Sequence, residues 1–388
     1  MEKITDLIAK EEVVEITRQL LRCPSVNPPG DVSRCAEVIG QMLDSYGIPY
    51  EKVENKPGVA NVVARLKGQA GGKTLLLNGH FDVVPPGLNW TVDPFGGEVS
   101  GGNIYGRGAA DMKSGIAAII AAMAAVRRSG YRFRGEIVFT AIADEETGSI
   151  NGTLHLIEKG IIKADHAIVT EPTDLRIENG QRGLRWVEIV VKGKAAHGGR
   201  PHLGVNAVAH AARIVGEIER IKYDLEQANF EVGTPSISVT MIEGGVKVNI
   251  IPDQCKISLD RRMIPGETTT TVTAEIEEVL HRVQSPGVTT EINFLPARWD
   301  PYVISDQEPV VSALREAYVS ELGHEPEIRG KAACTDASHI YHYTGIPTVI
   351  FGPGDGRFSH TADEHADIEK IVQAARILAV AGVKLCGE

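Results

Sequence analysis

Short apolar runs that recur between helical segments are the feature that most limits the fold of this chain. Helical spacing of apolar residues marks 13–21 and 112–129, and another helix should start near Asp31 and stop at Gly47. Strands that are buried on both faces and separated by helices predict an α/β fold with an open, mixed but mostly parallel sheet flanked by helices. The expected strands are 60–66, 74–84, 135–143 and 166–170.

The pattern changes after Glu178, where strands and helices follow the order β-α-β-β-α-β. This order is typical of a small two-layer domain. We therefore expect an inserted domain at 182–294 and a larger discontinuous domain made of 1–181 and 295–388. The expected elements of the insert are strands at 183–193, 236–245, 255–264 and 289–295, and helices at 204–220 and 268–283.

Charge and composition exclude some classes of partner. The net charge is −11 and Lys and Arg form no cluster, so a nucleic-acid partner is not expected. The first twelve residues are too charged for a secretory signal, and the longest apolar stretch, 115–126, is too short to cross a bilayer. Five cysteines at scattered spacings contain no C-x-x-C pair and are expected to be reduced thiols. We expect a cytoplasmic protein with no membrane partner.

His80 and Asp82 stand at the end of an apolar run and are the first candidate site residues. Alternate residues of a strand share a face, so Asp82 could hold the His80 ring in one orientation, as a metal-ligating histidine requires. An H-x-D pair is a weak signal when it stands alone. A hydrogen-bonded loop anchor is the alternative.

Asp111 lies in a small-residue loop before a helix, in the stretch GRGAADMKSG. The glycines suggest a dinucleotide-binding loop, but Asp111 replaces the third glycine of that motif and would repel phosphate. A carboxylate in this place can instead bridge two cations, one through each oxygen. The alternative role is that of a helix N-cap.

Further polar side chains follow other strand-like runs. Asp144, Glu145 and Glu146 follow 135–143, Glu171 follows 166–170, and His360 follows a glycine loop after 346–354. Adjacent carboxylates repel one another unless a metal or protons intervene, although solvated loop charge is an alternative.

Together these side chains predict a metal pair. In α/β proteins the carboxyl ends of the strands form the edge where ligands bind. Two imidazoles and three carboxylates, one of them bridging, make two sites of mixed nitrogen and oxygen ligation, which suits zinc, with cobalt or manganese as substitutes. The five predicted ligands are His80, Asp111, Glu146, Glu171 and His360.

Six motifs in this order resemble the dinuclear-zinc amidohydrolases that include acetylornithine deacetylase, succinyl-diaminopimelate desuccinylase, aminoacylase and the glutamate carboxypeptidases. The resemblance covers nearly the whole chain and implies a zinc-exopeptidase-like catalytic domain. The motifs are GHFDVVPPG, GRGAADMKSG, ADEETGS, TEPTD, AHGGRPHLGVNA and FSHTADEH.

The resemblance implies a role for each residue of the site. One metal would be held by His80, Asp111 and Glu171, and the other by Asp111, Glu146 and His360. Asp82 would orient His80, and Glu145 would be the general base for a metal-bound hydroxide.

The resemblance also implies roles for residues of the insert. His197 would act across a homodimer interface as an oxyanion donor, while Arg262 and Asn249 would bind a substrate carboxylate. An ion pair with Asp260 and a loop hydrogen bond are the alternatives for Arg262 and Asn249. Four further histidines match no ligand position and are expected to be structural: His202, His339, His342 and His365.

The expected function is hydrolysis of the amide bond of a small N-acylated amino acid. A dipeptidase or carboxypeptidase with the same metals is the alternative. A non-catalytic binding protein is disfavoured, because such a protein could lose Glu145, which this chain retains.

Overall fold

The computed structural model describes residues 2–223 and 232–387, and the chain divides into two compact units. The larger unit contains the chain up to Gly180, Val303–Lys331 and the chain from Thr335 onward. The smaller unit contains Gln181–Tyr302 and Ala332–Cys334. The predicted insert, 182–294, falls inside the smaller unit, and its exact limits stay a prediction.

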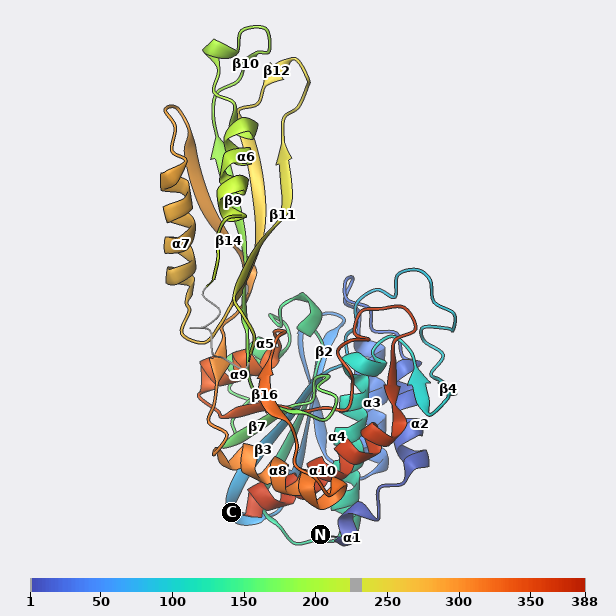
Figure 1. The fold of residues 1–388 in the computed structure, drawn as a ribbon. Helices are drawn as coiled ribbons and strands as arrows, with labels where there is room; N and C mark the ends of the chain where they lie inside the picture. The colour runs from blue at the N-terminus through green and yellow to red at the C-terminus, as the bar shows by residue number, and fades with distance from the viewer. Residues whose placement is uncertain (1, 224–231, 388) are drawn as a thin grey trace. The chain divides into compact units, whose positions relative to one another are not determined.

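A nine-stranded sheet forms the centre of the larger unit (Figure 1). Its strands lie in the order β1-β2-β6-β3-β7-β17-β8-β15, with β16 beside β8. The bounds along this order are β1 (Tyr50–Lys56), β2 (Val59–Lys67), β6 (Arg134–Ile142), β3 (Gln69–His80), β7 (His166–Val169), β17 (Thr348–Ile350), β8 (Ile177–Gln181), β15 (Tyr302–Val303) and β16 (Ile328–Lys331).

The sheet is mixed, as the sequence predicts. Its four central strands, β6, β3, β7 and β17, are parallel to one another. Antiparallel pairs stand on both sides, β1 with β2 and β2 with β6 on one side and β17 with β8 on the other. The four parallel strands therefore deliver their carboxyl ends to one edge, where His80 is paired with Ile142 and Val169 with Ile350.

Helices pack on this sheet and on one another. The C-terminal helix α10 packs against α4, α8 and strands β3 and β6. The bounds are α1 (Glu2–Thr5), α2 (Lys10–Leu21), α3 (Ser33–Ser45), α4 (Ser114–Ser129), α5 (Thr153–Glu158), α8 (Pro309–Leu322), α9 (Asp336–Thr344) and α10 (Ile368–Gly387). Two short helical turns, η1 (Ala109–Lys113) and η2 (Glu145–Thr147), and a small sheet of β4 (Glu98–Ser100), β5 (Asn103–Tyr105) and β18 (His365–Asp367) complete the unit.

Helix α4 is buried along almost its whole length, from Ser114 to Val126. Together with η1 it forms a helical stretch, Ala109–Ser129, whose length and composition would allow it to cross a membrane. The expectation that this segment is too short was therefore wrong, because the helix extends beyond the apolar run 115–126. Since 94% of the stretch's most apolar window is buried inside the fold, its composition is that of a core helix.

In the part of the smaller unit that the structure describes, a four-stranded antiparallel sheet forms one layer and the helices α6 and α7 form the other (Figure 1). The strand order is β11-β13-β9-β14, and apolar side chains of α6 and α7 join those of the strands in one core. The predicted β-α-β-β-α-β order is confirmed, with two short strands, β10 and β12, added. The bounds are β9 (Gly183–Lys192), β10 (Ala196–His197), η3 (Pro201–Leu203), α6 (Ala207–Ile218), β11 (Ser236–Gly244), β12 (Ile250–Ile251), β13 (Gln254–Met263), α7 (Thr269–Arg282) and β14 (Thr289–Trp299).

Gly115 allows α4 to approach the end of β7 closely. A methyl group added there would lie 2.2 Å from the backbone oxygen of Thr170. We predict that Gly115→Ala lowers the free energy of unfolding by about 1–3 kcal/mol, the usual cost of overpacking. Gly216→Ala in α6 is the control, because no described atom beyond its chain neighbours and the backbone of its own helix lies within 4 Å of the added group. That variant should gain about 0.5–1 kcal/mol. Urea unfolding measures both, and stabilisation by both would contradict the steric argument.

Candidate metal centre

The carboxyl edge of the central strands carries the predicted site. His80 is the last residue of β3, and Glu145 and Glu146 begin η2, with two residues between η2 and the end of β6. Glu171 follows β7, His360 lies in the loop after β17, and Asp111 lies in η1. All five predicted ligands therefore come from segments of the larger unit that meet at one edge of the sheet.

Asp111 stands between the two histidines. Its Oδ1 lies 3.2 Å from His80 Nε2, and its Oδ2 lies 3.6 Å from His360 Nε2. The same two nitrogens face one further carboxylate each, Glu171 Oε1 at 3.6 Å from His80 and Glu146 Oε1 at 3.2 Å from His360. The five side chains thus form two sets that share Asp111.

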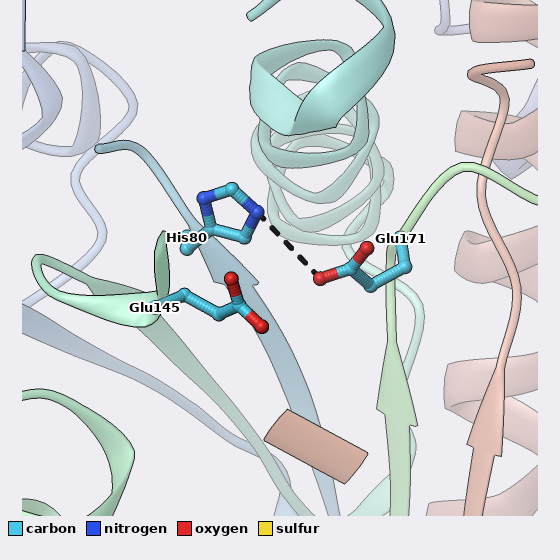
Figure 2. Close-up of side chains that lie close together, drawn as sticks. All are labelled: His80, Glu145 and Glu171. Atoms are coloured by element: carbon cyan, nitrogen blue, oxygen red, sulfur yellow. Dashed lines mark ion pairs between the residues drawn. The ribbon is translucent and has the colours of Figure 1, made fainter. Parts of the chain in front are cut away.

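The donor atoms fit a pair of divalent metals. Ligand atoms of His80, Asp111 and Glu146 lie within 4.8 Å of one another, and so do those of His80, Glu145 and Glu171 (Figure 2). These two clusters differ from the two predicted sets, because they share His80 rather than Asp111 and neither contains His360. Imidazole nitrogens mixed with carboxylate oxygens suit zinc, cobalt or manganese. The His360 side chain is 52% exposed, whereas that of His80 is 2% exposed. The second set is therefore open to solvent on one side, as a catalytic rather than a structural metal site requires.

The electrostatics of the site also favour cations. Burial, together with the charge of Asp111, raises the pKa of Glu171 to about 8. Burial raises the pKa of the Glu145 carboxyl well above its ordinary value. Carboxylates crowded in this way need protons or metal ions to balance their charge, and divalent metals would satisfy all of them at once.

Asp82 contacts His80 in a different way from that predicted. Strand β3 ends at His80, so the two residues do not share a strand. The backbone oxygen of Asp82 lies 2.9 Å from His80 Nδ1, and its carboxylate lies 3.5 Å from the same nitrogen. That carboxylate also accepts the backbone N–H groups of Glu145 (3.1 Å) and Glu146 (3.2 Å). Asp82 therefore contacts the imidazole and holds the loop that carries two further site residues.

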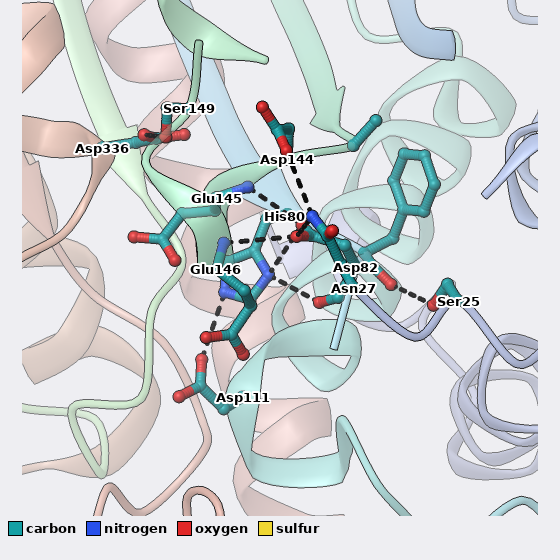
Figure 3. Close-up of polar contacts among 12 residues, drawn as sticks. Ser25, Asn27, His80, Asp82, Asp111, Asp144, Glu145, Glu146, Ser149 and Asp336 are labelled. Carbon is teal, nitrogen blue, oxygen red and sulfur yellow. Dashed lines mark hydrogen bonds and ion pairs between the residues drawn. The ribbon is translucent and has the colours of Figure 1, made fainter. Parts of the chain in front are cut away.

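The sequence did not predict two residues that support the site, Asn27 and Asp336 (Figure 3). The Asn27 amide donates to Asp82 Oδ2 at 2.9 Å and to Asp144 Oδ1 at 3.1 Å. Asp336 is buried and accepts hydrogen bonds from the hydroxyls of Ser149 and Thr153. These contacts join segments that are 55 to 187 residues apart, so no local pattern could have revealed them.

Asp111 does not have its alternative role. Among the described residues no side chain caps the N-terminus of α4, and the Asp111 carboxylate faces the histidines instead. The loop glycine Gly108 has φ of 93°, a left-handed conformation that favours glycine. An added Cβ there would lie 2.8 Å from the Val83 side chain.

His197 and Asn249 lie close together within the smaller unit. His197 is exposed and pairs with Ile250 between β10 and β12. Its Nδ1 accepts the backbone N–H of Gly199 at 3.0 Å, and the N–H of Gly198 donates to the Asn249 backbone oxygen at 2.8 Å. Their roles in catalysis and substrate binding stay predictions.

Arg262 makes the ion pair that was considered as its alternative role. Its Nε and Nη2 donate to the two carboxylate oxygens of Asp260, at 2.8 and 3.1 Å. The remaining nitrogen, Nη1, lies 3.8 Å from the Cys334 sulfur. The predicted contact with substrate would therefore use Nη1, or it would require the ion pair with Asp260 to break.

The other histidines lie outside both metal-ligand clusters found among the described residues. His365 packs its ring 4.0 Å from that of Phe358 and 4.9 Å from that of Tyr105, measured between ring centres. His202 is exposed in η3, and His339 and His342 belong to α9.

Known proteins resemble this chain over nearly its whole length. It is 30% identical to N-formyl-4-amino-5-aminomethyl-2-methylpyrimidine deformylase of Bacillus subtilis, covering 95% of this chain and 93% of that protein. It is 31% identical to succinyl-diaminopimelate desuccinylase of Methylorubrum populi, covering 94% of this chain and 96% of that protein.

A solved structure has the same fold. A dinuclear metal-binding peptidase of the M20 family from Bacillus subtilis superposes with a TM-score of 0.76 at 18% identity, over 97% of this chain and 98% of that one. The family model for peptidase family M20/M25/M40 matches residues 76–381, which include every predicted site residue. The chain therefore belongs to peptidase family M20/M25/M40.

Proposed function

We propose that this chain is a metal-dependent amidohydrolase that removes the acyl group from a small N-acylated amino acid. The observation that carries the proposal is Asp111, which presents one carboxylate oxygen to each of two histidines. Support comes from the two relatives, whose names describe a deformylase and a desuccinylase.

The proposed metal ligands are the two sets that share Asp111. His80, Asp111 and Glu171 would hold one zinc ion, and Asp111, Glu146 and His360 the other, with cobalt or manganese as substitutes. Two metals bound in this way would lower the pKa of a water molecule and polarise the scissile carbonyl.

Glu145 is the proposed general base. It is buried beside His80 and Glu171 (Figure 2). Its backbone N–H donates to the Asp82 carboxylate at 3.1 Å (Figure 3). The Glu145 carboxylate would take a proton from the attacking water and give it to the leaving nitrogen as the amide C–N bond breaks. The products are the free carboxylic acid and the free amine.

We predict that Glu145→Gln keeps both metals and loses most of its turnover, because the amide cannot take up the proton. His80→Ala should lose metal, since His80 contacts both Asp111 and Glu171. Metal content by plasma emission spectrometry and kcat on the same samples check this. Chelation should abolish wild-type activity, and zinc or cobalt should restore it. A Glu145→Gln enzyme that turns over at the wild-type rate would contradict the assignment of the base.

The substrate class separates the proposal from its alternative, a dipeptidase or carboxypeptidase. The structural relative is a peptidase, so the fold is compatible with both reactions. We predict that the zinc-loaded enzyme hydrolyses N-formyl, N-acetyl or N-succinyl amino acids with a higher kcat/KM than dipeptides of the same amino acid. Ninhydrin detection of the released amine, with Glu145→Gln as the blank, measures both. Preference for the dipeptides would favour the peptidase.

We also propose a homodimer formed through the smaller unit. Strand β11 is an edge strand of its sheet, and Met241 and Ile242 on it are 54% and 50% exposed. An exposed apolar edge strand is suited to pair with another chain. The resemblance further suggests that His197 donates to the oxyanion of the neighbouring subunit's substrate.

We predict that a mixed dimer of His197→Ala and Glu145→Gln subunits regains activity. Loss of one oxyanion donor costs about 10²–10³ in rate, so each variant alone should be nearly inactive. In the mixed dimer one of the two sites would hold both an intact Glu145 and an intact His197. Differently tagged subunits, purified as heterodimers, provide the sample. Purified heterodimers without activity would contradict action across the interface.

Two further assignments belong to the proposal. Arg262 and Asn249 would bind the substrate carboxylate, since a guanidinium can meet a carboxylate with paired hydrogen bonds. The cytoplasm is the proposed compartment. Support comes from the five cysteines, which are all free thiols in the described residues, as is usual in a reducing compartment.

A further inference from the structure

Glu364 is a fully buried carboxylate that the catalytic proposal does not use. Its Oε1 accepts the backbone N–H groups of Gly108 (3.0 Å), Ala110 (2.9 Å) and Asp111 (3.0 Å). Its Oε2 accepts a hydrogen bond from the buried guanidinium of Arg107. A single side chain therefore binds three backbone N–H groups of the turn that carries Asp111.

The same residue links this turn to the segment that carries His360. The backbone oxygen of Glu364 accepts the N–H of Gly106 at 2.8 Å. The pairing continues between β18 and β5, where His365 lies opposite Tyr105. Because His360 is only four residues from Glu364, the two segments that supply Asp111 and His360 are joined at this point.

The contact requires a carboxylate rather than any acceptor. Hydrogen bonds to an ionised acceptor are roughly twice as strong as those to a neutral one, and this oxygen accepts three. Without it the N–H groups of Gly108 and Ala110, which are both buried, would lose the hydrogen bond to Glu364, and unsatisfied buried donors are costly. A glutamine would also turn its amide N–H₂ toward the donors of Arg107.

We propose that Glu364 is a positioning residue for the metal centre. Its carboxylate fixes the backbone of 108–111 so that Asp111 presents one oxygen to His80 and the other to His360. The inference rests on the proposed function, because it assumes that Asp111 bridges two metals. Glu364 would then orient the proposed ligand Asp111, in the way that Asp82 would orient the proposed ligand His80.

A purely structural ion pair with Arg107 is the competing explanation. Arg107 also donates to the Pro86 backbone oxygen and lies over the Trp90 ring, so it stabilises the surrounding loops by itself. An ion pair of this kind would affect the free energy of unfolding but not the way in which metal is bound by the folded protein. Metal affinity and the spectrum of bound metal distinguish the two.

The test is cobalt titration of the metal-free Glu364→Gln protein, followed by visible absorption. Loss of a residue that orients a metal ligand typically weakens metal binding 10–100-fold, which is the expected result, with altered d–d bands. Glu267→Gln is the matched control, because Glu267 likewise pairs with a buried arginine, Arg261, and accepts a backbone N–H, from Ile264. Its cobalt affinity and spectrum should equal those of the wild type.

Wild-type affinity and an unchanged spectrum in folded Glu364→Gln would overturn the inference, and so would equal losses in both variants. If Glu364→Gln does not fold, Glu364→Asp replaces it, since the shorter carboxylate cannot reach Arg107 and all three N–H groups together. Wild-type cobalt affinity in that variant would also overturn the inference. Failure of the wild type to bind two cobalt ions would instead contradict the proposed function.

Discussion

Repulsion among four carboxylates at one sheet edge is the constraint on which the site depends. Asp111, Glu145, Glu146 and Glu171 are brought together by segments that the core holds firmly, so they cannot separate to relieve their charge. Burial and mutual repulsion raise the pKa of Glu171 to about 8. Two histidines provide partial compensation, and a pair of divalent cations would complete it. The charge of the site therefore favours the binding of cations.

Hydrogen bonds to buried carboxylates, rather than packing by bulky side chains, hold the segments that carry these charges. Asp82 accepts the backbone N–H groups of the turn that carries Glu145 and Glu146, and Glu364 accepts those of the turn that carries Asp111. In both cases a buried carboxylate binds the backbone of a segment that carries a proposed metal ligand. Under the proposed function, such ligands would need little rearrangement to meet a metal, which is the general advantage of preorganised sites.

Local pattern was sufficient for the central strands, because each is a buried apolar run that ends in a polar side chain. It also predicted that the five proposed ligands would lie near one edge of the sheet, since parallel strands bring their carboxyl ends to one edge; their role as ligands stays a prediction. It failed where the partner is distant in the chain. Glu364 lies 253 residues from Asp111 and Asn27 lies 55 residues from Asp82, and neither contact leaves a trace in periodicity. The end of β3 at His80 was likewise missed, because the apolar run continues through Val83 and Val84.

The central claim is that five side chains hold two metals with Asp111 between them. A crystal of the zinc-loaded protein, measured at the zinc absorption edge, tests it most directly through the anomalous difference map. Two peaks per chain are expected, one between His80 and Glu171 and one between Glu146 and His360, with one Asp111 oxygen at each. A single peak, or two peaks of which one is out of reach of Asp111, would contradict it.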